Sequence, residues 1–170
     1  ADEFVNKVIG IPGYKPAYSF FPGWIQGVEG KFVDEYPSLK PAIDYAAARS
    51  LVMEALRDQG LAEAPAITLL SVTSSTGAKI AEYLQGLLQQ RLGIDVKVDQ
   101  QTLKQYLDKS RNGQFDIVLS SWYPDFDDIL TYADLLASWN PNNRGDYRSE
   151  EYDRNLQVVM RATAARTRMD

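Results

Sequence analysis

The sequence contains no histidine and no cysteine. Without histidine it lacks the commonest general base, the usual partner of a catalytic serine and the commonest metal ligand. Without cysteine it has no disulfides, no thiolate chemistry and no cysteine-based metal site, although many exported proteins also lack cysteine. These two absences narrow the range of enzymes and metal sites that the chain can form.

Basic charge and long apolar runs are also scarce. The net charge is −5 and the isoelectric point is near 4.8, which argues against nucleic acid as a partner because such binding needs a basic face. No apolar run approaches the roughly 20 residues of a membrane span. The segment Ala1–Phe4 shows no signal-peptide pattern. We therefore expect either a cytosolic chain or one whose leader has been removed.

The composition is that of a folded protein. The chain has 170 residues, of which 45% are hydrophobic and 11% aromatic, which predicts a single globular domain that buries roughly two-thirds of its unfolded surface. Glycine and proline recur between residues 10 and 41, with aromatic residues among them. We expect residues 1–41 to form a loop-rich segment packed on the domain surface and residues 42–170 to form an α/β core.

Beyond residue 41 the hydrophobic periodicity alternates between helix and strand. Three strands are predicted, at Ile67–Leu70, Ile94–Val98 and Phe115–Ser120. The helices between them indicate a βαβαβ order, which favours a right-handed, mainly parallel sheet. A short helix near residues 129–138 and a last helix after Ser149 follow. The predicted apolar face of that last helix consists of Tyr152, Leu156, Val159, Met160 and Ala164.

Capping residues mark the ends of the predicted helices. Asp44 is expected to cap the first long helix, one of Ser74, Ser75 or Thr76 the second, and Gly93 to stop that second helix. Thr102 and Gln105 match a capping box for the third. The run 74–79 also occupies the position of a phosphate loop, but its glycine and lysine are wrongly spaced, so a plain helix cap is the favoured interpretation.

The most informative segment joins the third predicted strand to the carboxylates that follow it. After Ile117–Leu119, an apolar run typical of a buried strand, the chain changes abruptly to Ser121, Trp122, Tyr123 and Asp125. Ligand sites in α/β proteins lie at the carboxyl ends of strands. An aromatic ring beside a carboxylate suits a ligand with a positively charged amine and an apolar body. The pattern therefore favours binding over catalysis.

The three carboxylates of this segment, Asp125, Asp127 and Asp128, also suggest a metal site or an acid/base pair. The glycine and distal glutamate of a calcium loop are not at their expected spacing. For Asp127 and Asp128 we favour a solvated turn in which one of them caps the next helix. For Asp125, beside Trp122 and nearest the strand end, we favour a ligand role.

The order of these features resembles the oligopeptide-, dipeptide- and nickel-binding type of bacterial solute-binding protein that serves ABC importers. The resemblance runs from about residue 8 to residue 165 and depends on several short motifs in sequence order. These are Pro16-Ala17, the helix from Asp44 to Gly60, Gly93–Val96, Tyr106, Gly113–Asp116, Ser121–Ile129 and Tyr147–Asp153. Ser121, Ile129 and Ser149 depart from the family pattern, which has glycine, proline and asparagine there.

The resemblance implies a lobe of the type II periplasmic-binding-protein fold, present here as a fragment of a larger two-lobed protein. It implies a monomer that captures oligopeptides by cleft closure and delivers them to an ABC permease. The protein would lie outside the cytoplasmic membrane, in the periplasm or the extracellular space, either free or lipid-anchored. It further implies that Asp125 pairs with the ligand's α-amino group and that Trp122 forms a neighbouring wall, with Tyr123 and Ser121 also contacting ligand. The expected protein needs no cofactor and no metal, and its missing first lobe would enclose the ligand from the other side.

Other interpretations remain open at this point. Within the same family the ligand could be a nickel chelate, an opine, a sugar or another ligand that carries positive charge. Outside it, Asp125 with Asp127 or Asp128 could serve a carboxylate-dependent hydrolase. A response-regulator-like domain is disfavoured because no lysine ends a late strand where that fold needs one. No basic residue lies between Ile117 and Asp128, so a partner for a ligand carboxylate is not evident.

Overall fold

The computed structural model describes residues 4–40 and 42–163. Their contacts divide the chain into two compact units. The first, which we call the sheet unit, combines residues 4–16 with residues 42–120; the second, the loop unit, combines residues 17–40 with residues 121–163. The division predicted from the sequence lies near residue 41, whereas in the structure residues 17–40 belong to the same unit as residues 121–163.

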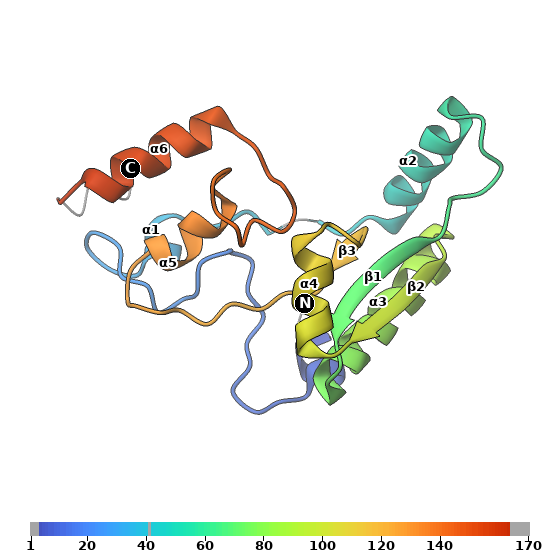
Figure 1. Cartoon of the computed structure of the whole chain (residues 1–170), viewed down its shortest axis with the longest axis horizontal. Coiled ribbons are helices and arrows are strands. Elements are labelled where there is room, and N and C mark those ends of the chain that lie inside the picture. Colours follow the sequence, from blue (N-terminus) through green and yellow to red (C-terminus); the bar gives the residue numbers. More distant parts are fainter. Residues whose placement is uncertain (1–3, 41, 164–170) are drawn as a thin grey trace. The chain divides into compact units, whose positions relative to one another are not determined.

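The sheet unit contains a three-stranded parallel sheet (Figure 1). Its strands are β1 (Ile67–Val72), β2 (Val96–Gln101) and β3 (Ile117–Val118), in the order β2-β1-β3. Ile67 pairs with Val96 in the register of β1 and β2, and Leu69 pairs with Ile117 in that of β1 and β3. The prediction of three adjacent parallel strands in a βαβαβ order is confirmed.

Two strand boundaries differ from the prediction. β2 begins at Val96 rather than Ile94 and continues to Gln101, because the Ile94 N–H donates to the Leu88 carbonyl and so completes the preceding helix. β3 is shorter than the predicted Phe115–Ser120. Hydrogen bonding nonetheless extends past both of its ends, since Asp116 N–H donates to Thr68 and Leu119 N–H donates to Leu70.

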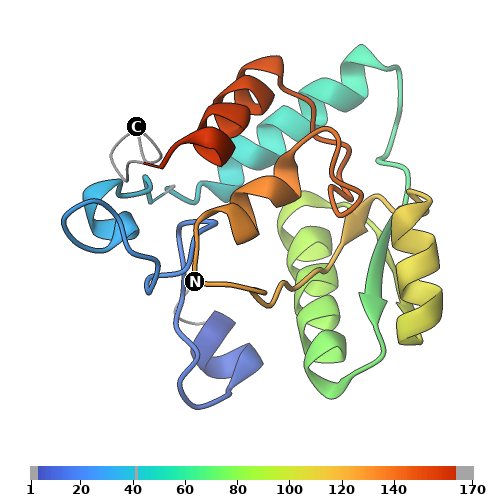
Figure 2. The ribbon, with the colours of Figure 1, turned by 60° about the vertical axis from the view of Figure 1, so that its left-hand side comes forward.

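Helices cover both faces of this sheet. Figure 2 shows α3 (Ser75–Leu92) and α4 (Leu103–Arg111) on opposite sides of β1, as expected when both crossovers of a β2-β1-β3 sheet are right-handed. The core on the α3 side is formed by Leu69, Ala81 and Val96, all at most 1% exposed. The helix α2 (Tyr45–Asp58) and the short π-helix η1 (Phe4–Ile9) both contact α3.

The predicted caps were mostly correct. Asp44 accepts a hydrogen bond from Ala47 N–H and Ser74 accepts one from Gly77 N–H, while Gly93 ends α3 in the left-handed conformation. A Cβ atom on Gly77 would lie 2.7 Å from the Val72 carbonyl oxygen, so glycine lets the first turn of α3 approach β1 closely. The bond from Gly77 N–H to Ser74 confirms the helix-cap interpretation of this run.

The capping box at Thr102 was wrong. The Thr102 side chain caps no backbone N–H, and its hydroxyl instead donates to the side-chain oxygen of Gln105 at 2.7 Å. A capping box requires that the hydroxyl accept from a backbone N–H of the first turn. The two side chains are bonded to each other, so the helix α4 begins without this cap.

The loop unit contains short helices and long connections. Its helices are α1 (Phe32–Glu35), α5 (Leu130–Ala133), the 3-10 helix η2 (Asp134–Leu136) and α6 (Glu150–Arg161). One part of its core is formed by Ile25, Ile129 and Tyr132, and another by Ala133, Ala137 and Leu156. Two aromatic residues of the Gly/Pro-rich segment, Phe21 and Phe32, pack against the first of these clusters, and their rings meet edge to face.

The last helix begins as predicted, with the Ser149 hydroxyl accepting from Tyr152 N–H. Of its predicted apolar face, Leu156 is buried and Tyr152 and Val159 are half-buried. Met160 is wrongly assigned to that face, since it is 54% exposed. Ala164 lies outside the described residues.

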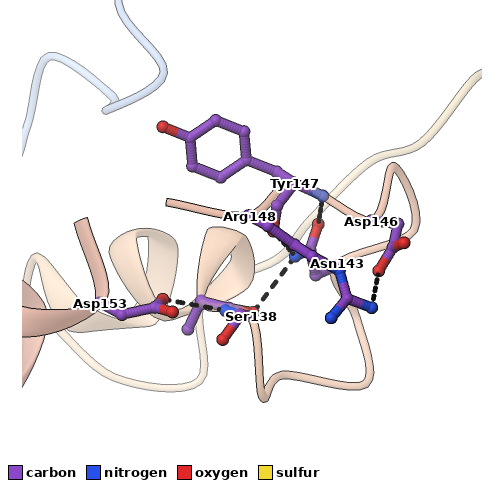
Figure 3. Close-up of polar contacts among 7 residues, drawn as sticks. Ser138, Asn143, Asp146, Tyr147, Arg148 and Asp153 are labelled. Carbon is purple, nitrogen blue, oxygen red and sulfur yellow. Dashed lines mark hydrogen bonds and ion pairs between the residues drawn. The ribbon is translucent and has the colours of Figure 1, made fainter. Parts of the chain in front are cut away.

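The connection before α6 is held by side chains that bind backbone groups (Figure 3). The Asn143 side chain accepts from Tyr147 N–H and donates to the Tyr147 carbonyl, and Asp153 accepts from Ser138 N–H at 3.0 Å. Hydrogen bonds from Ser138 lower the pKa of Asp153 below its ordinary value. The loop is therefore ordered by polar contacts rather than by regular secondary structure.

Candidate ligand-binding site

The candidate segment Ser121–Asp128 begins shortly after the end of β3, with Leu119 and Ser120 in between. The last hydrogen bond of the ladder is made by Leu119 N–H, and the Leu119 carbonyl accepts from the Tyr106 hydroxyl at 3.0 Å. Tyr106 lies on α4 and is 9% exposed. A buried side chain thus fixes the point at which the strand ends and the irregular segment begins.

Within this segment, Trp122 and Asp125 share one partner. The indole N–H of Trp122 and the backbone N–H of Asp125 both donate to the Thr131 hydroxyl, at 3.4 and 3.3 Å. Thr131 belongs to α5 and is 5% exposed. Two of the four predicted site residues are therefore brought together by a buried hydroxyl of the following helix.

The Asp125 side chain is left to solvent. The residue is exposed, and among the described residues its carboxylate has no hydrogen-bond or ion-pair partner. Trp122 is 36% exposed. A carboxylate without an internal partner, beside a partly exposed indole, can receive a cationic group from a ligand.

The other two predicted site residues are less constrained. Tyr123 is 80% exposed and Ser121 is exposed, and within the part of the chain that the structure describes neither side chain makes a hydrogen bond or ring contact. Phe126, which the sequence analysis did not select, is 54% exposed. The segment therefore offers several aromatic surfaces to solvent, and the ring of Trp122 is the one that is hydrogen-bonded to a buried side chain.

The remaining carboxylates take the structural role that the sequence analysis favoured. An Asp128 oxygen accepts from the N–H of Leu130, the first residue of α5, at 2.9 Å, so Asp128 satisfies a backbone group at the helix start as predicted, although the N-cap position itself is Ile129. Asp127 is exposed. Across residues 4–40 and 42–163, no three carboxylate, histidine or cysteine side chains gather in a way that could hold a metal ion.

Thr131 is the residue that sequence reasoning missed. A threonine in the second position of a short helix carries no pattern that distinguishes it from any other buried threonine. The only available signal was its position six residues after Asp125, and this distance acquires meaning only when the chain is seen to turn back on itself.

Comparison with known proteins identifies the family. The family model for bacterial extracellular solute-binding proteins, family 5 (middle region), matches residues 2–144. The chain belongs to this family. The resemblance drawn from the short motifs is thereby confirmed, and the family's members are solute-binding proteins rather than enzymes.

Curated relatives are similar over nearly the whole chain. The dipeptide-binding protein DppE of Bacillus subtilis is 29% identical over 169 residues, which is 98% of this chain and 31% of DppE. The periplasmic murein peptide-binding protein MppA of Escherichia coli is 30% identical over 151 residues, 89% of this chain and 27% of MppA. The chain thus spans about a third of the length of the curated relatives it matches.

Solved structures confirm the fold. A peptide-binding protein of a peptide ABC transporter superposes with a TM-score of 0.85 at 27% identity, covering 99% of this chain and 74% of that one. The substrate-binding domain of an oligopeptide ABC transporter from Bacillus anthracis gives 0.84 at 26% identity, covering 99% and 33%. The predicted α/β fold of the type II periplasmic-binding-protein class is correct. None of the described helices is long and apolar enough to cross a membrane.

Proposed function

We propose that this chain is part of the second lobe of a two-lobed solute-binding protein that captures oligopeptides for an ABC permease. The observation that carries the proposal is the match over nearly the whole chain to proteins named for binding dipeptides and murein peptides. The complete protein is expected to act as a monomer, periplasmic or extracellular, free or lipid-anchored. It would bind its ligand without chemical turnover.

In this proposal Asp125 receives the α-amino group of the peptide. Its carboxylate is exposed and free of internal partners among the described residues, so it loses no protein contact when it binds an ammonium group. Trp122 beside it offers an apolar surface to the first residue of the ligand. Charge-assisted hydrogen bonds of this kind are among the stronger polar contacts in proteins.

The test uses the complete protein, with calorimetry on a free peptide and on the same peptide N-acetylated. Asp125→Asn keeps the side-chain shape but removes its charge, so the free peptide should bind more weakly by roughly 2–5 kcal/mol. The acetylated peptide has no amino charge. It should bind the wild type poorly and lose little further affinity in the variant.

Two neighbouring carboxylates serve as controls. Asp127→Asn and Asp128→Asn change an exposed group and a helix cap, so each should alter stability by no more than about 1 kcal/mol and leave affinity nearly unchanged. Equal binding of free and acetylated peptide to the wild type would show that Asp125 is not the amine anchor.

The identity of the ligand needs a separate measurement. Mass spectrometry of what co-purifies with the complete protein distinguishes peptides from the nickel chelates, opines and sugars that also fit the family. Incubation of the same protein with peptide should yield no cleavage products. Release of products would instead favour a hydrolase.

We also expect the 170-residue chain by itself to bind peptide weakly or not at all. Half of an enclosing site leaves the ligand solvated on one side and forfeits the affinity gained on closure. Calorimetry on this chain with a peptide library measures the effect. Affinity equal to that of the complete protein would contradict the two-lobed reading.

A further inference from the structure

We propose that Thr131 is a positioning residue for the ligand site, because its buried hydroxyl fixes both the Trp122 ring and the Asp125 backbone. The ligand part of this inference rests on the proposed function above. The contact itself does not, since it is a property of the folded chain. The two parts can therefore be tested separately.

The hydroxyl of Thr131 is held by the core of the loop unit. Its neighbours in the chain, Ile129, Tyr132 and Ala133, are all at most 9% exposed. Tyr132 also meets the rings of Phe20 and Trp24, each at a centroid distance of 6.3 Å. Because α5 is anchored on both sides of Thr131, the position of the hydroxyl oxygen is set by packing and not by the exposed segment.

The hydroxyl can serve both donors at once. A threonine oxygen has two lone pairs, whereas the indole N–H is a donor only and is the one polar atom of the tryptophan ring. Its bond to Thr131 therefore turns the nitrogen edge of Trp122 inward, while the residue as a whole stays 36% exposed and offers ring surface for another contact. The second bond holds the backbone of Asp125.

The bond to Asp125 is made by its N–H and not by its carboxylate. This arrangement fixes the point from which the side chain projects while leaving both carboxylate oxygens available. Tyr123 lies between the two tied residues in sequence, yet it is 80% exposed. The hydrogen bonds to Thr131 thus restrain Trp122 and Asp125, the two residues to which the proposed function assigns ligand contacts.

The first test measures the contact in the 170-residue chain by ¹⁵N NMR. Thr131→Val keeps the branched shape and removes the acceptor, whereas Thr131→Ser keeps the hydroxyl. Hydrogen exchange of the Trp122 indole N–H, assigned with Trp122→Phe, and of the Asp125 amide should become about two- to tenfold faster in the valine variant. The serine variant should exchange at the wild-type rate.

The second test measures selectivity in the complete protein. In Thr131→Val the ratio of free-peptide to N-acetyl-peptide affinity should fall about tenfold, with Thr131→Ser restoring it. Thr76→Val, a half-buried threonine in the first turn of α3, is the matched control and should leave the ratio unchanged.

The outcomes separate the two proposals. Unchanged exchange of the Trp122 and Asp125 protons in Thr131→Val overturns the contact. If the affinities of Thr131→Val for free and for N-acetylated peptide fall by the same factor, Thr131 has only a structural role. That result overturns the positioning inference, while the proposed function stands. A wild-type protein that binds no peptide overturns the proposed function and the ligand part of this inference with it. A wild-type protein that binds free and acetylated peptide equally overturns the amine-anchor role of Asp125 and the ligand part of this inference, while peptide capture stands.

Discussion

The sheet unit and the loop unit are stabilised in different ways. In the sheet unit, parallel strands satisfy one another's backbone groups, and apolar side chains at regular spacing meet between β1 and α3. In the loop unit, individual side chains satisfy the backbone of turns. The Glu35 carboxylate alone accepts from the N–H groups of Val28, Glu29 and Gly30.

This difference explains where a ligand site can be built. The backbone of a buried strand cannot bind a ligand, because its N–H and C=O groups are already paired with neighbouring strands. A loop held by side-chain acceptors keeps other side chains exposed while its backbone stays fixed. The segment from Ser121 to Asp128 combines both features, since it begins at the end of a strand and is tied by Thr131 to a helix of the loop unit.

The largest effect should come from the core of the sheet unit. Leu69 is fully buried in β1, between α3 and the neighbouring strands. Leu69→Ala removes buried methyl groups and leaves a cavity, so the free energy of unfolding should fall by about 2–5 kcal/mol. Urea titration measures the loss, and hydrogen exchange should show it first in the amides of β1.

Leu103→Ala is the matched control, because this leucine on α4 is 62% exposed. This substitution should change the free energy of unfolding by no more than about 0.5 kcal/mol. Equal losses for the two leucines would contradict the assignment of Leu69 to the core.

The corresponding test in the loop unit is Glu35→Gln. A carboxylate accepts from three N–H groups here, whereas an amide directs a donor toward at least one of them. Stability should fall by about 1.5–3 kcal/mol, as for hydrogen bonds to charged groups. The change is measured by urea titration, with exchange of the Val28, Glu29 and Gly30 amides identifying the site.

Asp34→Asn, an exposed neighbour on α1, provides the control and should change stability little. A larger loss in Glu35→Gln than in Leu69→Ala would reverse the comparison between the units. It would mean that the loop unit depends more on this one side chain than the sheet unit depends on its core.

The sequence predicted best those features that depend on near neighbours. Asp44 and Ser149 were recognised as caps, and Ser74 as one of three candidates, because a capping side chain bonds an N–H only three residues away. The strands β1 and β3 were found as short apolar runs, and β2 was found by its alternation of apolar and polar residues. The alternation of strand and helix then determined a parallel sheet, since parallel strands need a long crossover.

The features that were predicted wrongly or not at all have a common physical cause, which is that they depend on contacts not encoded by local sequence patterns. Met160 follows the helical spacing of Leu156, but whether that side of α6 is covered depends on residues distant in sequence. The Thr102 and Gln105 pair has the composition of a capping box, yet its two side chains bond each other. The Thr131 contact requires the chain to reverse after Asp125, and no local pattern encodes this. Asp125 itself was selected by position and family resemblance, and its ligand role stays a prediction.

A smaller effect is expected where the sheet unit ends. The Tyr106 hydroxyl donates to the Leu119 carbonyl, two residues before Ser121. Tyr106→Phe leaves that carbonyl without this donor, so stability should fall by about 0.5–1.5 kcal/mol. Thermal unfolding measures the loss, and NMR shifts should be concentrated at residues 118–122.

Tyr83→Phe, on the opposite helix α3, is the control, because Tyr83 contacts its neighbour Phe4 through the ring, which phenylalanine retains. If the two variants lose the same stability, the Tyr106 hydroxyl does not anchor the strand end. In that case the segment 121–125 would depend on Thr131 alone.

The smallest effect, and the one that depends on pH, concerns an ion pair between β2 and α4. Asp99 accepts from Lys109 Nζ at 2.6 Å and from Gln101, and these bonds lower the pKa of Asp99 below its ordinary value. A carboxyl group whose pKa is lower in the folded than in the unfolded state stabilises the fold above its unfolded pKa of roughly 3.9, and this stabilisation is lost as the pH falls through the folded value. Asp99→Asn should therefore cost about 0.5–1 kcal/mol at pH 7, as expected for a partly exposed pair.

The difference in free energy of unfolding between wild type and Asp99→Asn, called the gap below, should narrow as the pH falls below about 4. Urea titrations at pH 7, 5 and 3 would measure it. Added salt should also reduce the gap at pH 7, because screening weakens a partly exposed pair. The exposed Asp95 precedes the same strand, and Asp95→Asn should show no comparable gap at pH 7. A gap that stays constant into acid would mean that Asp99 acts through its shape and neutral hydrogen bonds. This ion pair would then give the sheet unit no charge-dependent stability, and its contrast with the Glu35 carboxylate of the loop unit would become sharper.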